Sequence, residues 1–257
     1  MASAGNNTGS DWNSWWQEAG GYKENQSVAW DLMDSDKTGY LLDRIGRTQG
    51  RLLEVGCGTA RMSVRLARVG YSTVCLDNSI FALSLARENY SKCKWTFAGL
   101  AGDGYRLPFS DNAFDGVLST GLLEHFRDPI PLIKEMVRVT RPGGFIYADI
   151  LPKKKWRLLL LFDFIRPLFG RYTDDLFEMP FSRDDILGFL QTSGLKEAEV
   201  FPAGIYWPRW PVLRSSRLLV GMENTMCRIT HPLFKALDRS FFAEIFGIYY
   251  FMMGRKP

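Results

Sequence analysis

Short apolar runs alternate with amphipathic stretches over most of the chain, and the two patterns predict strands and helices in turn. Such an alternation is typical of a parallel sheet with helices on both faces. The expected fold is α/β: a doubly wound, mostly parallel seven-stranded sheet with helical cap insertions. The predicted strands are residues 51–55, 72–76, 94–97, 116–119, 145–150, 197–201 and 247–254. The predicted helices are residues 60–69, 80–90, 131–140 and 182–193.

Other segments lie outside this pattern. Residues 1–11 are expected to be a disordered lead, and residues 12–50 an N-terminal helical cap. Insertions near residues 151–181 and 206–245 interrupt the main domain, residues 51–257. We expect these segments to roof a ligand site, with their aromatic side chains lining an apolar pocket. The alternative is that the aromatics only pack the extra helices onto the core. They are Trp12, Trp15, Trp16, Tyr22, Trp30, Trp156, Trp207 and Trp210.

The most informative motif is LLEVGCGTA, residues 52–60, in which an apolar run turns through two glycines into a helix-like stretch. Gly56 and Gly58 let a ligand come close to the backbone, and the helix after them begins with unpaired N–H groups. A strand, a tight turn and a helix at the carboxyl edge of a parallel sheet form a pocket for a nucleotide-type ligand. Taken alone, the two glycines are equally consistent with a structural turn.

The spacing of the small residues argues against a dinucleotide. The motif Gly-x-Gly-x-x-Gly would need a third glycine at position 61, which is Arg61, and the third small residue is Ala60. The carboxylate of Glu54 would repel a pyrophosphate and attract a cationic ligand. S-adenosylmethionine carries an ammonium and a sulfonium and no phosphate, so it suits this arrangement of charge.

A second acid ends the next apolar run. Asp77 lies 19 residues beyond Gly58, close to the ~20 expected for an acid that binds a ribose. A carboxylate there accepts hydrogen bonds from both ribose hydroxyls, and Asn78 adds an amide contact to the adenine or the ribose. The alternative is that Asp77 caps the following helix, because Asp-Asn-Ser is good N-cap chemistry. The two roles are compatible.

Five motifs in this order resemble those of the class I S-adenosylmethionine-dependent methyltransferases, in particular the small-molecule, type 11-like group. EVGCGTA resembles the first motif and LDNS the second, and the resemblance is clearest over residues 52–150. GDGYRLPFSDNAFDGVLS resembles the third and fourth motifs, and LLEHFRDP with RPGG the later ones. Ala60 stands in place of the family's third glycine, as in many members.

The resemblance implies a Rossmann-like fold and adds residues to the cofactor site. Asp103 is expected near the adenine amino group, with Gly102 and Gly104 beside it. Ser119 and Thr120 are expected under the methionine part of the cofactor.

The chain has two histidines, His125 and His231. His125 follows the fourth predicted strand, and its reference pKa near 6.5 suits a general base. The alternative is a structural contact at the start of a helix, since Glu-His pairs are widespread in similar methyltransferases. Some relatives bind a divalent metal through Glu-x-x-Glu-His, but the first position here is Gly121. Glu124 and His125 alone are too few ligands, so no metal site is expected.

Composition limits the size of the domain and the cellular compartment to be expected. The chain has 257 residues, 46% of them hydrophobic, enough to bury one domain core. Its four cysteines show no C-x-x-C spacing, which indicates small buried thiols in a reducing compartment. The N-terminus lacks the basic and apolar regions of a secretion signal, and no apolar run is long enough to span a bilayer. These features predict a cytoplasmic protein.

Charge adds a candidate for surface attachment. The net charge is only +4, short of the dense basic stripe typical of nucleic-acid binding, so no nucleic-acid partner is expected. The basic excess lies in residues 151–257 and favours an anionic substrate or a lipid surface. Residues 153–170 contain three lysines before Trp156 and an apolar run, which predicts peripheral membrane contact. A solvated loop leading into a buried helix is the alternative.

The sequence therefore predicts S-adenosylmethionine-dependent methyl transfer to a small, hydrophobic or amphiphilic acceptor by in-line displacement. Alignment of the nucleophile, methyl and sulfur supplies up to ~7–11 kcal/mol without a metal. The main alternative is a cofactor-binding or regulatory module without turnover. A nicotinamide oxidoreductase is disfavoured by the glycine spacing.

Overall fold

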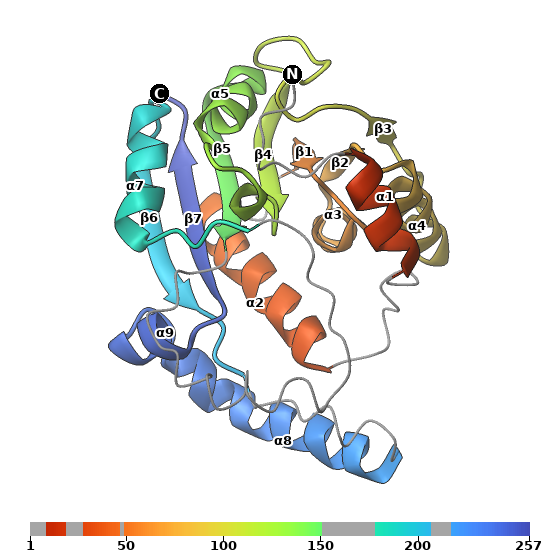
Figure 1. The fold of residues 1–257 in the computed structure, drawn as a ribbon, viewed down its shortest axis with the longest axis vertical. Coiled ribbons are helices and arrows are strands. Elements are labelled where there is room, and N and C mark those ends of the chain that lie inside the picture. Colours follow the sequence, from red (N-terminus) through yellow and green to blue (C-terminus); the bar gives the residue numbers. More distant parts are fainter. Residues whose placement is uncertain (1–8, 19–27, 47–48, 151–177, 207–216) are drawn as a thin grey trace.

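The computed structural model describes residues 9–18, 28–46, 49–150, 178–206 and 217–257. Within them, one seven-stranded sheet has the order β3-β2-β1-β4-β5-β7-β6 (Figure 1). Strands β1 to β5 run parallel, and β7 lies antiparallel between β5 and β6. The predicted doubly wound, mostly parallel α/β sheet is confirmed. The strands are β1 (Arg51–Val55), β2 (Ser72–Asp77), β3 (Gly99–Ala101), β4 (Phe114–Thr120), β5 (Thr140–Ile150), β6 (Lys196–Ala203) and β7 (Tyr249–Arg255).

Helices cover both faces of the sheet because side chains alternate along each strand. In β5, Ile146 and Ile150 enter one core, while Phe145 and Tyr147 enter the other. Helices α5 and α7 pack into the first core, and α2 and α3 into the second. The helices are α1 (Gly9–Glu18), α2 (Val28–Ile45), α3 (Arg61–Arg68), α4 (Ile80–Lys92), the 3-10 turn η1 (Leu123–His125), α5 (Ile130–Val139), α7 (Arg183–Thr192), α8 (Arg217–Ala236) and α9 (Phe241–Phe246).

Side-chain caps fix the starts of two helices, one at the residue that the sequence indicated and one two residues later. The Ser182 hydroxyl accepts from the Asp185 N–H and the Asp185 carboxylate accepts from the Ser182 N–H, which completes the capping box of α7. At α4 the cap is Ser79, whose hydroxyl accepts from the Ala82 N–H at 3.1 Å. Asp77 therefore leaves the capping position to Ser79.

The third strand was predicted at the wrong place. Residues 94–97 form no strand, and β3 follows them. Lys94 has a left-handed φ of 59° and extends the turn that ends α4. The aromatic rings at positions 95 and 97 pack beside α3 and α4, so the apolar signal there reports burial and not strand pairing. The pairing with β2 begins at Gly99, opposite Cys75.

The segments outside the core are described in part. Helix α1 begins at Gly9, inside the predicted lead of residues 1–11. Helices α8 and α9 belong to the second insertion, and α8 lies along one end of the molecule (Figure 1). Residues 153–170, predicted to contact a membrane, lie outside the described residues, as do Tyr22, Trp156, Trp207 and Trp210.

No helix within the described ranges is both long and apolar enough to cross a bilayer. All four cysteines are free thiols, three of them buried.

Candidate functional site

A cavity of about 420 Å³ opens where β1, β2, β4 and β5 end. Parallel strands place their carboxyl ends at one edge of the sheet, so residues distant in the sequence meet there. Helix α1 packs against α4 beside this edge (Figure 1). Nearly all of the predicted site residues line the cavity: Gly56, Gly58, Asp77, Asn78, Gly102, Asp103, Gly104, Thr120 and His125.

The loop after β1 has a backbone that requires glycine. Gly56 and Gly58 have φ angles of 66° and 50°, and Ala60 follows at 57°. A Cβ on Gly58 would lie 2.8 Å from the Trp16 ring, and one on Gly56 would lie 2.7 Å from Leu122. The left-handed backbone at Ala60 costs an alanine roughly 1–2 kcal/mol, which the surrounding packing offsets. The loop is thus held tightly under the ring of Trp16.

Glu54 lies behind the cavity wall instead of on it. Its side chain is buried; it accepts from the Ser63 N–H at 3.0 Å and from the Thr120 hydroxyl at 3.4 Å. Burial raises the pKa of Glu54 to about 7. The carboxyl group therefore joins the start of α3 to Thr120, which does line the cavity.

Asp77 ties the two loops around the cavity together. Its carboxylate accepts from the Gly58 N–H at 2.8 Å and from the Ser79 N–H at 2.9 Å. Burial raises its pKa, and the hydrogen bonds from these backbone groups oppose that rise. The structure thus places a buried carboxylate directly against the glycine loop.

The segment after β3 closes the same end of the cavity. Gly102 donates its N–H to the Asp77 carbonyl at 3.0 Å, and Asp103 accepts from the Tyr105 N–H at 2.9 Å. A Cβ on Gly104 would lie 2.9 Å from the end of the Leu132 side chain, so this turn packs closely against α5. Ser119 behaves differently, because it is fully buried in β4 and does not line the cavity.

His125 lies in η1 with its ring edge-on to Trp12, the ring centroids 4.7 Å apart. Trp12, Trp15 and Trp16 all come from α1 and line the cavity, as does Trp30 of α2. These tryptophans therefore line a pocket, the first of the two roles considered for them, and Trp16 also lies against the glycine loop.

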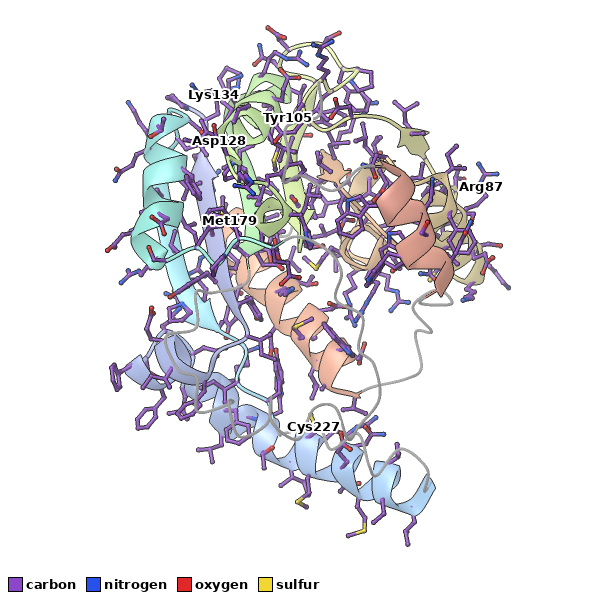
Figure 2. The ribbon with its side chains drawn as sticks, in the orientation of Figure 1. Arg87, Tyr105, Asp128, Lys134, Met179 and Cys227 are labelled. Atoms are coloured by element: carbon purple, nitrogen blue, oxygen red, sulfur yellow. The ribbon has the colours of Figure 1, made fainter. Side chains whose placement is uncertain are left out.

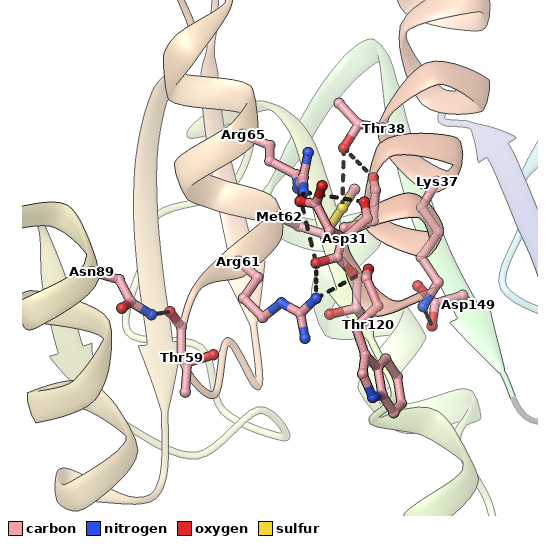
Figure 3. A network of polar contacts seen from close by, with 12 residues as sticks. Asp31, Lys37, Thr38, Thr59, Arg61, Met62, Arg65, Asn89, Thr120 and Asp149 are labelled. Carbon is pink, nitrogen blue, oxygen red and sulfur yellow. Dashed lines mark hydrogen bonds and ion pairs between the residues drawn. The ribbon is translucent and has the colours of Figure 1, made fainter. Parts of the chain in front are cut away.

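The opposite end of the cavity holds an ion pair that sequence reasoning did not find. Lys37 of α2 contacts Asp149 of β5 at 2.7 Å, and both side chains are buried (Figure 3). The Tyr147 hydroxyl donates to the second carboxylate oxygen at 3.0 Å. Asp149 is the register partner of Thr120, at the end of the apolar run FIYADI. The sequence did offer one signal for this site, because Asp149 is an acidic residue near the end of an otherwise apolar strand.

Further charges surround this end. Asp34 and Glu178 line the cavity, and Arg61 of α3 forms an ion pair with Asp34. The Glu124 carboxyl is buried behind them, and one of its oxygens has no hydrogen-bond partner. Burial, with Asp149 and Glu178 nearby, raises the pKa of Glu124 to about 8. Among the described side chains, no three His, Cys, Asp or Glu residues lie together in a way that could hold a metal ion.

Comparison with known proteins defines the family. A family model described as a methyltransferase domain matches residues 53–148. A demethylmenaquinone methyltransferase from Staphylococcus carnosus is 31% identical, over 60% of this chain and 72% of its own length. The uncharacterized methyltransferase C1B3.06c from Schizosaccharomyces pombe is 32% identical over 49% of each protein. The chain belongs to the class I S-adenosylmethionine-dependent methyltransferases.

Comparison with solved structures shows the same fold in known methyltransferases. Geranyl diphosphate C-methyltransferase from Streptomyces coelicolor, crystallised with S-adenosyl-L-homocysteine, superposes with a TM-score of 0.59. It is 13% identical, and the match covers 87% of this chain and 79% of that one. The chain spans about half the length of the first relatives that it matches.

Proposed function

We propose that this protein binds S-adenosylmethionine in the cavity and transfers its methyl group to a small amphiphilic acceptor. One observation carries the proposal: a single cavity joins a glycine loop flanked by acids to an apolar chamber that ends in a buried ion pair. The first end suits the cofactor, and the second suits an acceptor with both apolar and polar parts.

The residues at the glycine end fit the cofactor. Gly58 and Gly104 line the cavity and carry no side chain, so a flat adenosyl group is able to approach bare backbone there. We assign ribose binding to Asp77, with Asn78 beside it, and the adenine end to Asp103. The Glu54 carboxyl acts from behind the wall, by holding Thr120 in place.

S-adenosylmethionine supplies a methyl group already activated by its sulfonium. The chain's own task is then to orient the two reactants and to exclude water. Trp12, Trp15 and Trp16 of α1 do the second, since they cover the cavity between the glycine loop and His125. Their electron-rich rings also favour a cation beside them.

At the acceptor end, apolar side chains lie among the charged groups. Met33 and Met62 line the cavity with the tryptophans, and Lys37 and Asp149 present a positive and a negative group together. An acceptor with an apolar body and a hydroxyl or ionised group satisfies both. We assign the general base to His125, whose imidazole lines the same cavity.

The test is thermal unfolding with S-adenosylhomocysteine. At about 100 times its dissociation constant, the ligand adds ~2.7 kcal/mol, which raises Tm by roughly 5–10 °C for a chain of this size. Asp77→Asn should lose most of the shift. Incubation with methyl-labelled cofactor and a cell extract then separates the two functions: labelled product shows transfer, and a thermal shift without labelled product favours the module without turnover.

A further inference from the structure

A buried carboxyl group at the acceptor end of the cavity lacks one of its partners. Glu124 of η1 is 1% exposed, and its Oε2 atom has no hydrogen-bond partner among the described residues. Buried polar atoms in folded proteins are nearly always hydrogen-bonded, because an unsatisfied one loses its solvation without compensation. The oxygen therefore indicates a partner that the protein itself does not supply in the part of the chain described.

The carboxyl group lies close behind the cavity wall at Gly121. Gly121 lines the cavity, and its φ of 60° is the left-handed conformation that favours glycine. Apart from the two chain neighbours, the described atom that a Cβ built there would meet is Oε1 of Glu124, at 4.0 Å. The wall thus carries no side chain at this position beside the carboxyl group. His125, the next residue, lines the cavity as well.

Backbone hydrogen bonds hold this region on two sides. The Met179 N–H donates to the Glu124 carbonyl at 2.6 Å, and the Gly121 N–H donates to the Asp149 carbonyl at 3.4 Å. Figure 2 shows Met179 on the segment that leads into α7. The turn η1 is therefore tied both to β5 and to the segment before α7, which keeps Glu124 at the acceptor end.

The surroundings of this carboxyl group are short of positive charge. Burial raises the pKa of Glu124 most, and the negative charges of Asp149 and Glu178 add to the rise. Lys37, which is paired with Asp149 at 2.7 Å, opposes the rise less than either acid promotes it. A hydroxyl group would satisfy the oxygen without adding charge, and an anion would increase the repulsion. An ammonium group both donates hydrogen bonds and supplies the positive charge.

We propose that the methyl acceptor is an amine and that its ammonium group binds at the unpartnered oxygen of Glu124, beside Asp149. Trp12, Trp15 and Trp16 line the same cavity, and indole rings attract cations. Their apolar surface also suits the hydrocarbon part of an amine. This inference rests on the proposed function, since it names the chemical class of the acceptor for the same cavity.

An amine acceptor gives each proton and electron pair a place. The bound ammonium loses one N–H proton to His125, the base assigned above, and a lone pair is left on nitrogen. That pair forms the N–C bond as the C–S bond breaks, and the C–S electrons remain on sulfur. The products are the methylated ammonium and S-adenosylhomocysteine, and His125 passes its proton to solvent. The carboxyl group of Glu124 thus faces a cation both before and after transfer.

The experiment is isothermal titration calorimetry of the full chain, saturated with S-adenosylhomocysteine, with n-hexylamine at pH 7. Hexanol and hexanoate have the same apolar body without the positive charge, and both should bind at least about tenfold more weakly. Titrations in buffers of different ionisation enthalpy measure the protons released. Because the pKa of Glu124 is about 8, this group is mostly protonated at pH 7 and should release most of a proton when an ammonium binds beside it.

Variants assign that proton to its residue. Glu124→Gln should release none and should bind hexylamine roughly 10–100-fold more weakly, because an amide forms no ion pair. Glu88→Gln changes an exposed side chain of α4 and is the matched control, with binding and proton release as in the wild type. Circular dichroism and Tm verify folding. If Glu124→Gln does not fold, the comparison of hexylamine with hexanol on the wild type still decides.

Several results would overturn the amine proposal alone: no binding of hexylamine, equal binding of hexanol, or the same proton release from Glu124→Gln. Release of the proton on binding S-adenosylhomocysteine, with none left for hexylamine, would also overturn it, since the oxygen would then belong to the ammonium of the cofactor. In each of these cases S-adenosylhomocysteine still binds. Protein that does not bind S-adenosylhomocysteine contradicts the proposed function itself, and the amine proposal with it.

Discussion

The ring of Trp12 meets the imidazole of His125 edge-on, with ring centroids 4.7 Å apart. The contact joins α1 to η1 across the cavity, so the N-terminal helix is positioned partly by the candidate base. An edge-to-face pair of this kind contributes ~0.5–1.5 kcal/mol beyond the burial of area. One contact thus serves both closure of the cavity and orientation of the imidazole.

Replacing His125 separates these two roles. His125→Phe keeps an aromatic partner for Trp12 and removes the titrating group. If His125 is the base, the rate of labelled methyl transfer should fall about 10²–10⁴-fold, while the Tm shift with S-adenosylhomocysteine is retained. A variant with wild-type transfer would restrict His125 to a structural contact.

Two glycines give opposite expectations for the same substitution. Gly58→Ala places a methyl group 2.8 Å from Trp16 at a φ of +50°, so it should lower stability by about 1–2 kcal/mol and abolish the ligand-induced Tm shift. Gly39→Ala lies in α2 with open space around it, and should stabilise the protein by about 0.5–1 kcal/mol. Urea unfolding with and without S-adenosylhomocysteine measures both. Equal ligand shifts in the two variants would contradict the role given to the glycine loop.

The Lys37–Asp149 ion pair predicts that substitutions of its two residues have coupled effects on the free energy of unfolding. Each of Lys37→Met and Asp149→Leu leaves one buried charge without its partner and should lower the free energy of unfolding by about 3–5 kcal/mol. The double variant should lose much less than the sum, since neither charge remains. A double-mutant cycle by urea denaturation measures the coupling. Simple additivity would mean that the pair is screened by water in the cavity.

Glu124 predicts a pH dependence of stability. Its pKa is about 8 in the folded protein, against an ordinary value of 4.5. Between pH 4.5 and pH 8 the carboxyl group is therefore mostly protonated in the folded state and mostly ionised in the unfolded state. Stability should therefore fall as the pH rises through this window, by at most about 1.4 kcal/mol per pH unit from this group. Glu54, Asp34 and Asp77 have raised pKa values too and act in the same direction.

Glu124→Gln isolates this contribution, because the amide resembles the protonated acid and does not titrate. Its stability should decline less steeply between pH 5 and pH 8 than that of the wild type. Glu88→Gln, which changes an exposed side chain of α4, should keep the wild-type slope. Identical slopes for all three proteins would exclude Glu124 as a source of the dependence.

Strand and motif signals could be read from the sequence because they are local. The corner at Gly56 and Gly58 and the acid at Asp77 each follow from neighbouring residues, and the structure places all three at one cavity. The third strand was misplaced because Trp95 and Phe97 are apolar for packing, while pairing with β2 falls on the exposed residues after them. Local hydrophobicity does not distinguish those two causes.

The acceptor end depends on contacts between distant residues, and no periodicity encodes them. Lys37 and Asp149 are 112 positions apart. Lys37 stands among other polar residues of α2, and nothing in that local sequence indicates that its side chain turns inward. Glu54 shows a related limit: its place at the end of β1 was evident, but its engagement by Ser63 and Thr120 depends on how α3 and β4 pack.

The position of β7 constrains when the sheet can be completed. This strand lies between β5 and β6, yet it follows both of them in the sequence, at residues 249–255. During synthesis on the ribosome, β5 must wait with an open edge until these residues have emerged, and β6 has no partner before then. Removal of residues 249–255 would take out an interior strand and split the sheet.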